Sequence, residues 1–117
     1  MTDHDREQIR ERFLTLNTAT ICDVYDELEW PVTALDNGIV RRTEERQVVA
    51  GWAYPIEGRM VNEKGADRLK LQVVDELPAG SVTVWAGTDA AGICLFGDLI
   101  AANMQKRGCH GAVVDGG

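Results

Sequence analysis

The chain contains few cysteines, and their spacing shows no C-x-x-C pair. The three cysteines, Cys22, Cys94 and Cys109, are odd in number, and no two of them have the C-x-x-C spacing. This pattern argues against a disulfide framework and against a zinc site. Free cysteine is among the most buried residue types, so the sequence predicts three buried or half-buried side chains.

Positive charge is also in short supply. The chain has 12 lysines and arginines against 19 aspartates and glutamates, which gives a formal net charge of −7. A face that follows phosphates needs a basic excess, so we expect no nucleic-acid partner.

Long apolar runs are absent. No segment approaches the roughly 18 apolar residues that a membrane span requires. Residues 1–7 lack the basic-then-apolar order of a signal peptide. We therefore expect no membrane partner and a cytoplasmic location.

Nucleotide-binding motifs are missing as well. The glycine-containing loop 87–92 has no Gly-Lys-Ser/Thr ending, and no G-x-G-x-x-G occurs in the chain. No glycine-rich motif of the kind that binds S-adenosylmethionine is present either. The loop is therefore interpreted as a connection.

What is present suits one globular domain. The 117 residues are 44% apolar, which is enough for one core. Apolar spacing predicts an opening helix over 3–16 and a second helix over 21–28 that Thr18 or Thr20 caps. Short β-type runs follow at 39–40, 48–50 and 51–56.

Helices and strands alternate in the second half. We expect a helix over 63–77 with an inward face, a strand over 81–85, a helix over 97–107 and a strand at 113–114. This order predicts a βαβ crossover, at least partly parallel pairing and an α/β fold. The residues expected to face inward from the two helices are Ala66, Leu69, Val73, Val74, Leu77, Leu99, Ile100 and Met104.

The strongest candidate for chemistry is the start of the helix over 97–107. Its first-turn N–H groups, from about Asp98 to Ile100, have no partners within the helix, and the missing side chain at Gly97 lets an anion approach the backbone. The alternative is structural: Gly97 is a turn residue and Asp98 a first-turn acid that stabilises the helix dipole.

Other polar residues carry weaker signals. Asp115 is an acid, a ligand or a turn former, because Asp-Gly-Gly is itself good turn chemistry. His4 and His110 have no partner at catalytic or metal spacing and are interpreted as surface or turn residues. Trp30, Trp52 and Trp85 are expected in core or interface packing.

Three segments together resemble the RraA-like family, which includes the 4-hydroxy-4-methyl-2-oxoglutarate aldolases. They are Ile21-Cys22-Asp23-Val24-Tyr25-Asp26-Glu27-Leu28, the helix-strand unit over 62–85, and Gly97-Asp98-Leu99-Ile100-Ala101 with 108–117. The resemblance spans the chain, and its specific part is the C-terminal motif. It implies a swivelling β/β/α three-layer domain, assembled as a homotrimer or a dimer of trimers with active sites between subunits.

The resemblance also implies an activity. A divalent cation, Mg²⁺ or Mn²⁺, holds a 2-oxo acid substrate and stabilises the enolate that carbon–carbon cleavage releases. Carried over to this chain, substrate binding falls to the backbone of Gly97, Asp98, Leu99 and Ile100, and Asp98 is the catalytic residue that positions the water or proton. None of the residues 1–117 is assigned as a metal ligand.

The family pattern continues with an Arg-Asp pair that begins two positions after the last glycine of the Asp-Gly-Gly turn. The arginine clamps the substrate carboxylate and the aspartate orders the metal. Both positions lie beyond Gly117. We therefore expect residues 1–117 to be a single domain, truncated at its C-terminus, and inactive alone. Two alternatives stay open: a non-catalytic regulator that binds ribonuclease E or a helicase, and a decayed domain without function.

Overall fold

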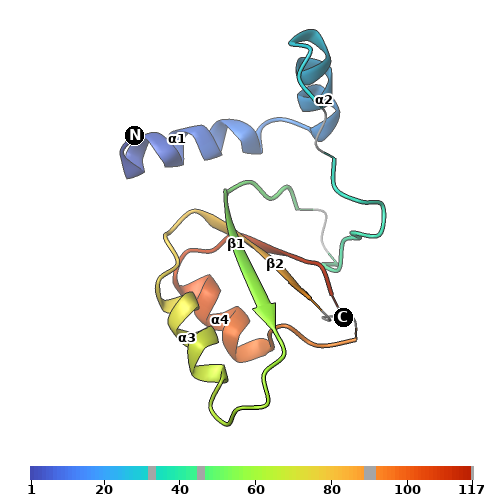
Figure 1. Cartoon of the computed structure of the whole chain (residues 1–117). Helices are drawn as coiled ribbons and strands as arrows, with labels where there is room; N and C mark the ends of the chain where they lie inside the picture. Colours follow the sequence, from blue (N-terminus) through green and yellow to red (C-terminus); the bar gives the residue numbers. More distant parts are fainter. Residues whose placement is uncertain (32–33, 45–46, 89–91, 117) are drawn as a thin grey trace. The chain divides into compact units, whose positions relative to one another are not determined.

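The computed structural model describes residues 1–31, 34–44, 47–88 and 92–116. The chain divides into two compact units, unit 1 over Met1–Ala50 and unit 2 over Gly51–Gly117. Unit 1 contains two helices, and unit 2 contains three strands and two helices (Figure 1). Each unit is described by itself.

Unit 1 opens with helix α1 (Asp3–Leu14) and continues with α2 (Thr18–Glu27). Thr2 and Asp5 form a capping box at the start of α1. The Asp5 N–H donates to the Thr2 hydroxyl, and the Thr2 N–H and hydroxyl both donate to the Asp5 carboxylate. The Asn17 side chain caps α2 by accepting from the N–H of Thr20 at 2.8 Å, so the expected threonine cap is wrong. Neither helix contains a buried residue.

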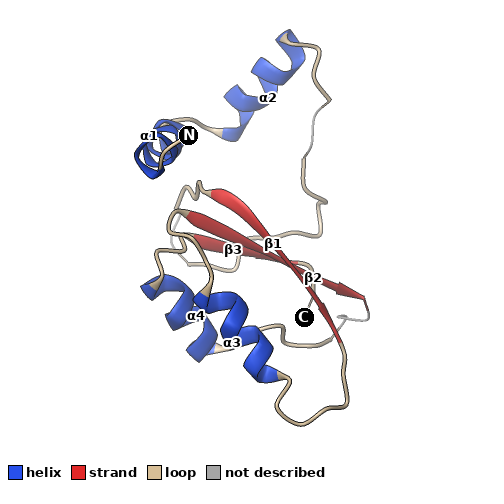
Figure 2. Ribbon diagram, turned by 60° about the vertical axis from the view of Figure 1, so that its left-hand side comes forward, coloured by secondary structure: helices blue, strands red, loops and turns tan. Residues whose placement is uncertain are grey.

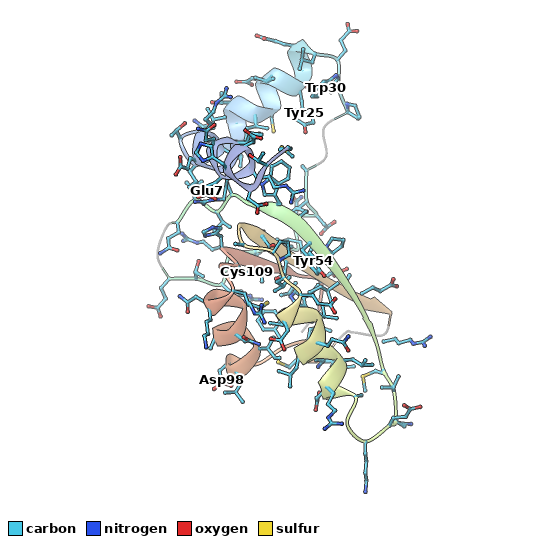
Figure 3. All side chains as sticks on the ribbon, turned by 90° about the vertical axis from the view of Figure 1, so that its left-hand side faces the viewer. Glu7, Tyr25, Trp30, Tyr54, Asp98 and Cys109 are labelled. Atoms are coloured by element: carbon cyan, nitrogen blue, oxygen red, sulfur yellow. The ribbon has the colours of Figure 1, made fainter. Side chains whose placement is uncertain are left out.

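The end of α2 is a Schellman motif. The Trp30 N–H donates to the Tyr25 carbonyl at 2.9 Å, and the Glu29 N–H donates to the Asp26 carbonyl at 3.1 Å. Glu29 has a φ of 53°, the left-handed conformation that glycine usually supplies at this position. The Tyr25 and Trp30 rings meet edge to face with centroids 5.6 Å apart, which is the apolar contact that accompanies this motif (Figure 3).

The rest of unit 1 differs from the sequence prediction. Residues 39–40 and 48–50 are not strands, although their β-branched composition predicted it. A short strand is stable only when it is paired in a sheet, and these runs have no strand partner among the described residues.

Unit 2 is built on a parallel sheet with strand order β1-β2-β3. Its strands are β1 (Trp52–Arg59), β2 (Ser81–Thr88) and β3 (Gly111–Val114), with Ile56 opposite Trp85 and Trp85 opposite Val114. Helix α3 (Asp67–Asp75) connects β1 to β2, and α4 (Asp98–Lys106) connects β2 to β3. The predicted α/β class and parallel crossover are therefore confirmed.

The two helices pack together and cover one face of the sheet (Figure 2). Between helices and sheet lies the core, which consists of Val74, Leu77, Trp85 and Met104. The expected inward face is only partly correct: Leu69 is 66% exposed and Leu99 is 81% exposed. Both leucines lie in the first turn of their helices, whereas the buried Val74 and Met104 lie in the later turns.

Strand β1 forms one edge of the sheet and contains a proline. The Trp52 N–H donates to the Gly80 carbonyl at 2.9 Å, so residues 52, 54, 56 and 58 direct their backbone groups toward β2. Pro55 therefore falls among the residues whose backbone groups face the free edge, where a missing N–H costs no ladder hydrogen bond. Just before β1, a Cβ on Gly51 would stand 2.7 Å from the Gly80 carbonyl oxygen, so only glycine permits this close approach.

The cysteine and tryptophan expectations are met in part. Cys109 is half-buried and packs against the core, but Cys22 and Cys94 are exposed, so their predicted burial is wrong. Trp85 belongs to the core, whereas Trp30 is largely exposed. Within the described part of the chain, no helix has the length and apolar character needed to cross a membrane.

Candidate active site

The start of α4 lies at the carboxyl edge of the parallel sheet. Strand β2 ends at this edge, and the chain then enters α4, which runs back antiparallel to the strands. Asp115 follows β3 at the same edge, and its N–H donates to the Trp85 carbonyl at 2.8 Å. In open α/β sheets, this is the edge at which ligands bind.

Gly97 is the N-cap of α4 and leaves the helix start open. Its backbone is extended, with φ −110° and ψ −168°, and its carbonyl accepts from the Ala101 N–H at 3.0 Å. No side chain of the described residues caps the helix, and a Cβ on Gly97 would meet none of their atoms within 4 Å. The described residues therefore leave the backbone of this turn open to an anion.

The first-turn N–H groups are partly engaged. The Leu99 N–H donates to the Asp98 carboxylate at 2.8 Å. Among the described residues, no group accepts from the N–H of Asp98 or Ile100. These two donors, together with the positive end of the helix dipole, are available to an anion, and a third becomes available if the Asp98 side chain rotates away.

The side chains after Gly97 separate into two environments. Ile100 packs against the core, whereas the Asp98 and Leu99 side chains are exposed. Asp98 is labelled at the end of α4 opposite Cys109 in Figure 3. Both earlier interpretations of Asp98 fit this geometry, because a first-turn acid stabilises the helix and also stands beside the free N–H groups.

An aromatic pair supports the turn before α4, and the sequence did not identify it as part of the site. The rings of Trp85 and Phe96 are tilted at 44° with centroids 5.1 Å apart, and Leu95 also packs against the core. Trp85 is 3% exposed. The apolar stretch 93–96 was the available signal, because it predicts a segment that must be anchored immediately before Gly97.

Neither histidine is placed at this edge by the contacts within its own unit. The His110 N–H donates to the Ser81 carbonyl at 2.8 Å, at the opposite, amino end of β2. His4 is in α1 and contacts Gln8, with 3.0 Å between Nε2 atoms. Neither is brought to Gly97 within its own unit, and their interpretation as surface or turn residues is retained.

A cation site is not assembled by the described residues. Within residues 1–31, 34–44, 47–88 and 92–116, no three histidine, cysteine, aspartate or glutamate side chains come together in a way that could hold a metal ion. Asp98 and Asp115 supply carboxylates at the same edge of the sheet, but two carboxylates alone do not make such a site.

Comparison with known proteins identifies the family of the chain. The family model RraA-like, described as Aldolase/RraA, matches residues 18–117. No curated protein and no solved structure gives a significant match. The matched region includes α2, all of unit 2 and the candidate site at α4.

Proposed function

Because the chain belongs to the RraA-like family, we propose that it acts as a lyase on 2-oxo acids. The proposed reaction is aldol cleavage of 4-hydroxy-4-methyl-2-oxoglutarate, or of a related 4-carboxy-2-hydroxy acid, to pyruvate. Oxaloacetate decarboxylation is a side or main activity. Both reactions pass through enolpyruvate, so one site that stabilises this intermediate can serve both.

The observation that carries the proposal is the open start of α4 at Gly97. A pyruvyl group carries a carboxylate and a carbonyl oxygen, and the carbonyl oxygen gains negative charge when the enolate forms. Preorganised N–H donors at a helix start stabilise such developing charge more than they stabilise the neutral carbonyl. The free N–H groups of Asp98 and Ile100 are the donors that this chain offers.

Asp98 has the second role in the proposal. Its carboxylate lies beside the same turn and is exposed, so it can orient a water molecule or the proton that converts enolpyruvate to pyruvate. Its present bond to the Leu99 N–H is local and exposed, so breaking this bond costs only about 1 kcal/mol.

A divalent cation is the proposed cofactor. The family resemblance predicts Mg²⁺ or Mn²⁺, and the described residues do not assemble a site for it. The roles proposed for the Asp98 carboxylate and for the N–H groups of Asp98 and Ile100 do not depend on the cation. The swivelling three-layer fold and the homotrimer or dimer of trimers are likewise proposals that rest on the resemblance.

A non-catalytic regulator that binds ribonuclease E or a helicase is the second candidate. Large apolar side chains are exposed on both helices of unit 1, including Phe13 and Leu28, and such side chains favour a macromolecular contact. This candidate predicts binding without turnover.

The deciding experiment is a coupled pyruvate-release assay. Oxaloacetate and 4-hydroxy-4-methyl-2-oxoglutarate are supplied to the protein with and without Mg²⁺. The lyase predicts metal-dependent release of pyruvate from at least one of the two substrates. Absence of release from both, with folding verified by circular dichroism, contradicts the lyase and favours the regulator.

A further inference from the structure

Each helix of unit 1 carries an apolar stripe that the other described residues of unit 1 do not fully cover. Ile9, Phe13 and Leu16 recur at helical spacing along α1 and into the turn after it. Phe13 is 46% exposed and Leu16 is 41% exposed. On α2, Val24 and Leu28 form a similar stripe and are 45% and 49% exposed.

Helices of this size need a packing partner. α1 has 12 residues and α2 has 10. Isolated helices shorter than about 12–15 residues are marginal in water and gain most of their stability by burying an apolar face. Among the described elements, α3 and α4 are the helix pair in extended contact, so α1 and α2 do not supply this burial to each other within one chain.

The stripe on α1 borders a groove of about 280 Å³. Its wall is mainly apolar, and Arg12 is its one charged lining residue among the described residues. Among the described residues, no carboxylate pairs with Arg12. The lining residues are Ile9, Arg12, Phe13, Thr15 and Leu16.

Helix α2 has the complementary character. Residues 13–40 contain five acids and no lysine or arginine. Glu27 is the acid of α2 that lies closest to the Val24 and Leu28 stripe, since it is three positions from one and adjacent to the other. No cation pairs with Glu27 in the described part of the chain.

We propose that the α1 groove of one copy receives the α2 stripe of a second copy, with Arg12 of each copy paired to Glu27 of the other. Val24 and Leu28 would then be buried against Ile9 and Phe13, as an amphipathic helix is buried in a groove. The contact is reciprocal, so a two-fold pair satisfies both grooves and both stripes. It uses unit 1 alone and does not depend on the proposed lyase activity.

Charge reversal tests this pairing by sedimentation equilibrium. Arg12→Glu and Glu27→Arg each place like charges in the contact, and each variant alone is expected to raise the dissociation constant of self-association at least about tenfold. An equal mixture of the two variants is expected to restore association, because each copy then offers the charge that the other lacks. Intrachain packing cannot produce this restoration.

Matched controls change the same charges elsewhere. Arg68→Glu and Glu63→Arg alter exposed positions of unit 2 and should leave association unchanged. Circular dichroism verifies helix content in every variant. The proposal is overturned if the wild-type chain stays monomeric, if the mixture associates no better than the single variants, or if the variants lose helix content without any change in mass.

Discussion

At the scale of single residues, Gly97 combines an open helix start with an unstrained backbone. The sequence predicted this segment as the candidate site, because Gly-Asp before an apolar helical pattern indicates a helix start. It did not predict that Leu99 would be exposed or that Phe96 would stack on Trp85. Helical spacing shows which residues share a face, but it does not show how far the core extends along the helix.

Gly97→Ser should separate stability from ligand binding. Serine is at least as good an N-cap as glycine, so the free energy of unfolding should stay constant or rise by a few tenths of a kcal/mol. Its Oγ would accept from a first-turn N–H, and its Cβ would occupy the open approach, so pyruvate affinity should fall about tenfold. Thermal unfolding and an NMR titration with pyruvate measure the two effects.

Ala102→Ser is the matched control for Gly97→Ser, because it adds the same hydroxyl to an exposed position of α4. It should leave pyruvate affinity unchanged. Equal affinity of the wild-type chain and Gly97→Ser would remove the start of α4 from the binding site.

At the scale of elements, the capping box makes the start of α1 sensitive to acid. The Thr2 N–H and hydroxyl donate to the Asp5 carboxylate at 2.7 and 2.8 Å, and they lower its pKa from the ordinary value of 3.8. A lowered pKa means that the folded helix favours the ionised carboxylate. This contribution is present above pH 3.8 and is lost as the pH falls through the lowered value.

We therefore expect α1 to fray at its N-terminus when acid protonates the Asp5 carboxylate, at a pH below 3.8. The measurement is the Asp5 carboxyl chemical shift against pH, with Thr2→Ala as the comparison. Removal of the threonine hydroxyl should move the Asp5 pKa upward, toward 3.8. Identical titration curves for the two proteins would show that the capping box does not form in solution.

Two neighbouring residues of α3, Val74 and Asp75, are expected to contribute very differently to the free energy of unfolding. Val74 is fully buried in the core, whereas Asp75 accepts from Arg107 at 3.1 Å on the surface. Val74→Ala should lower the free energy of unfolding by about 2 kcal/mol through lost burial and a residual cavity. Asp75→Ala should cost less than about 1 kcal/mol, because exposed ion pairs are weak. Urea unfolding of both variants measures the difference, and equal losses would contradict this ranking.

Element prediction succeeded where the periodicity was long and failed where it was short. The helices and strands of unit 2 were all found from sequence, with boundaries that differ by a few residues. The runs at 39–40 and 48–50 were wrong because two or three β-branched residues indicate only a local preference, and pairing decides whether a strand forms.

At the scale of the whole molecule, we expect unit 2 to be more stable against local unfolding than unit 1. Among the described residues, the buried core residues all lie in unit 2, and the helices of unit 1 contain none. Amide hydrogen exchange on a dilute sample should therefore be slowest in β2, α3 and α4 and much faster in α1 and α2. Protection of α1 equal to that of β2 at high dilution would contradict this division.

Because Pro55 lies on the β1 edge, the two edges of the sheet differ in their ability to pair with a further strand. A strand arriving beside β1 would find one donor missing in the middle of that edge, whereas the outer edge of β3 keeps every N–H. Edge-to-edge stacking of sheets through β1 into a fibre is thereby discouraged. A further strand is therefore expected to pair with β3, whose last residue, Val114, precedes Asp115.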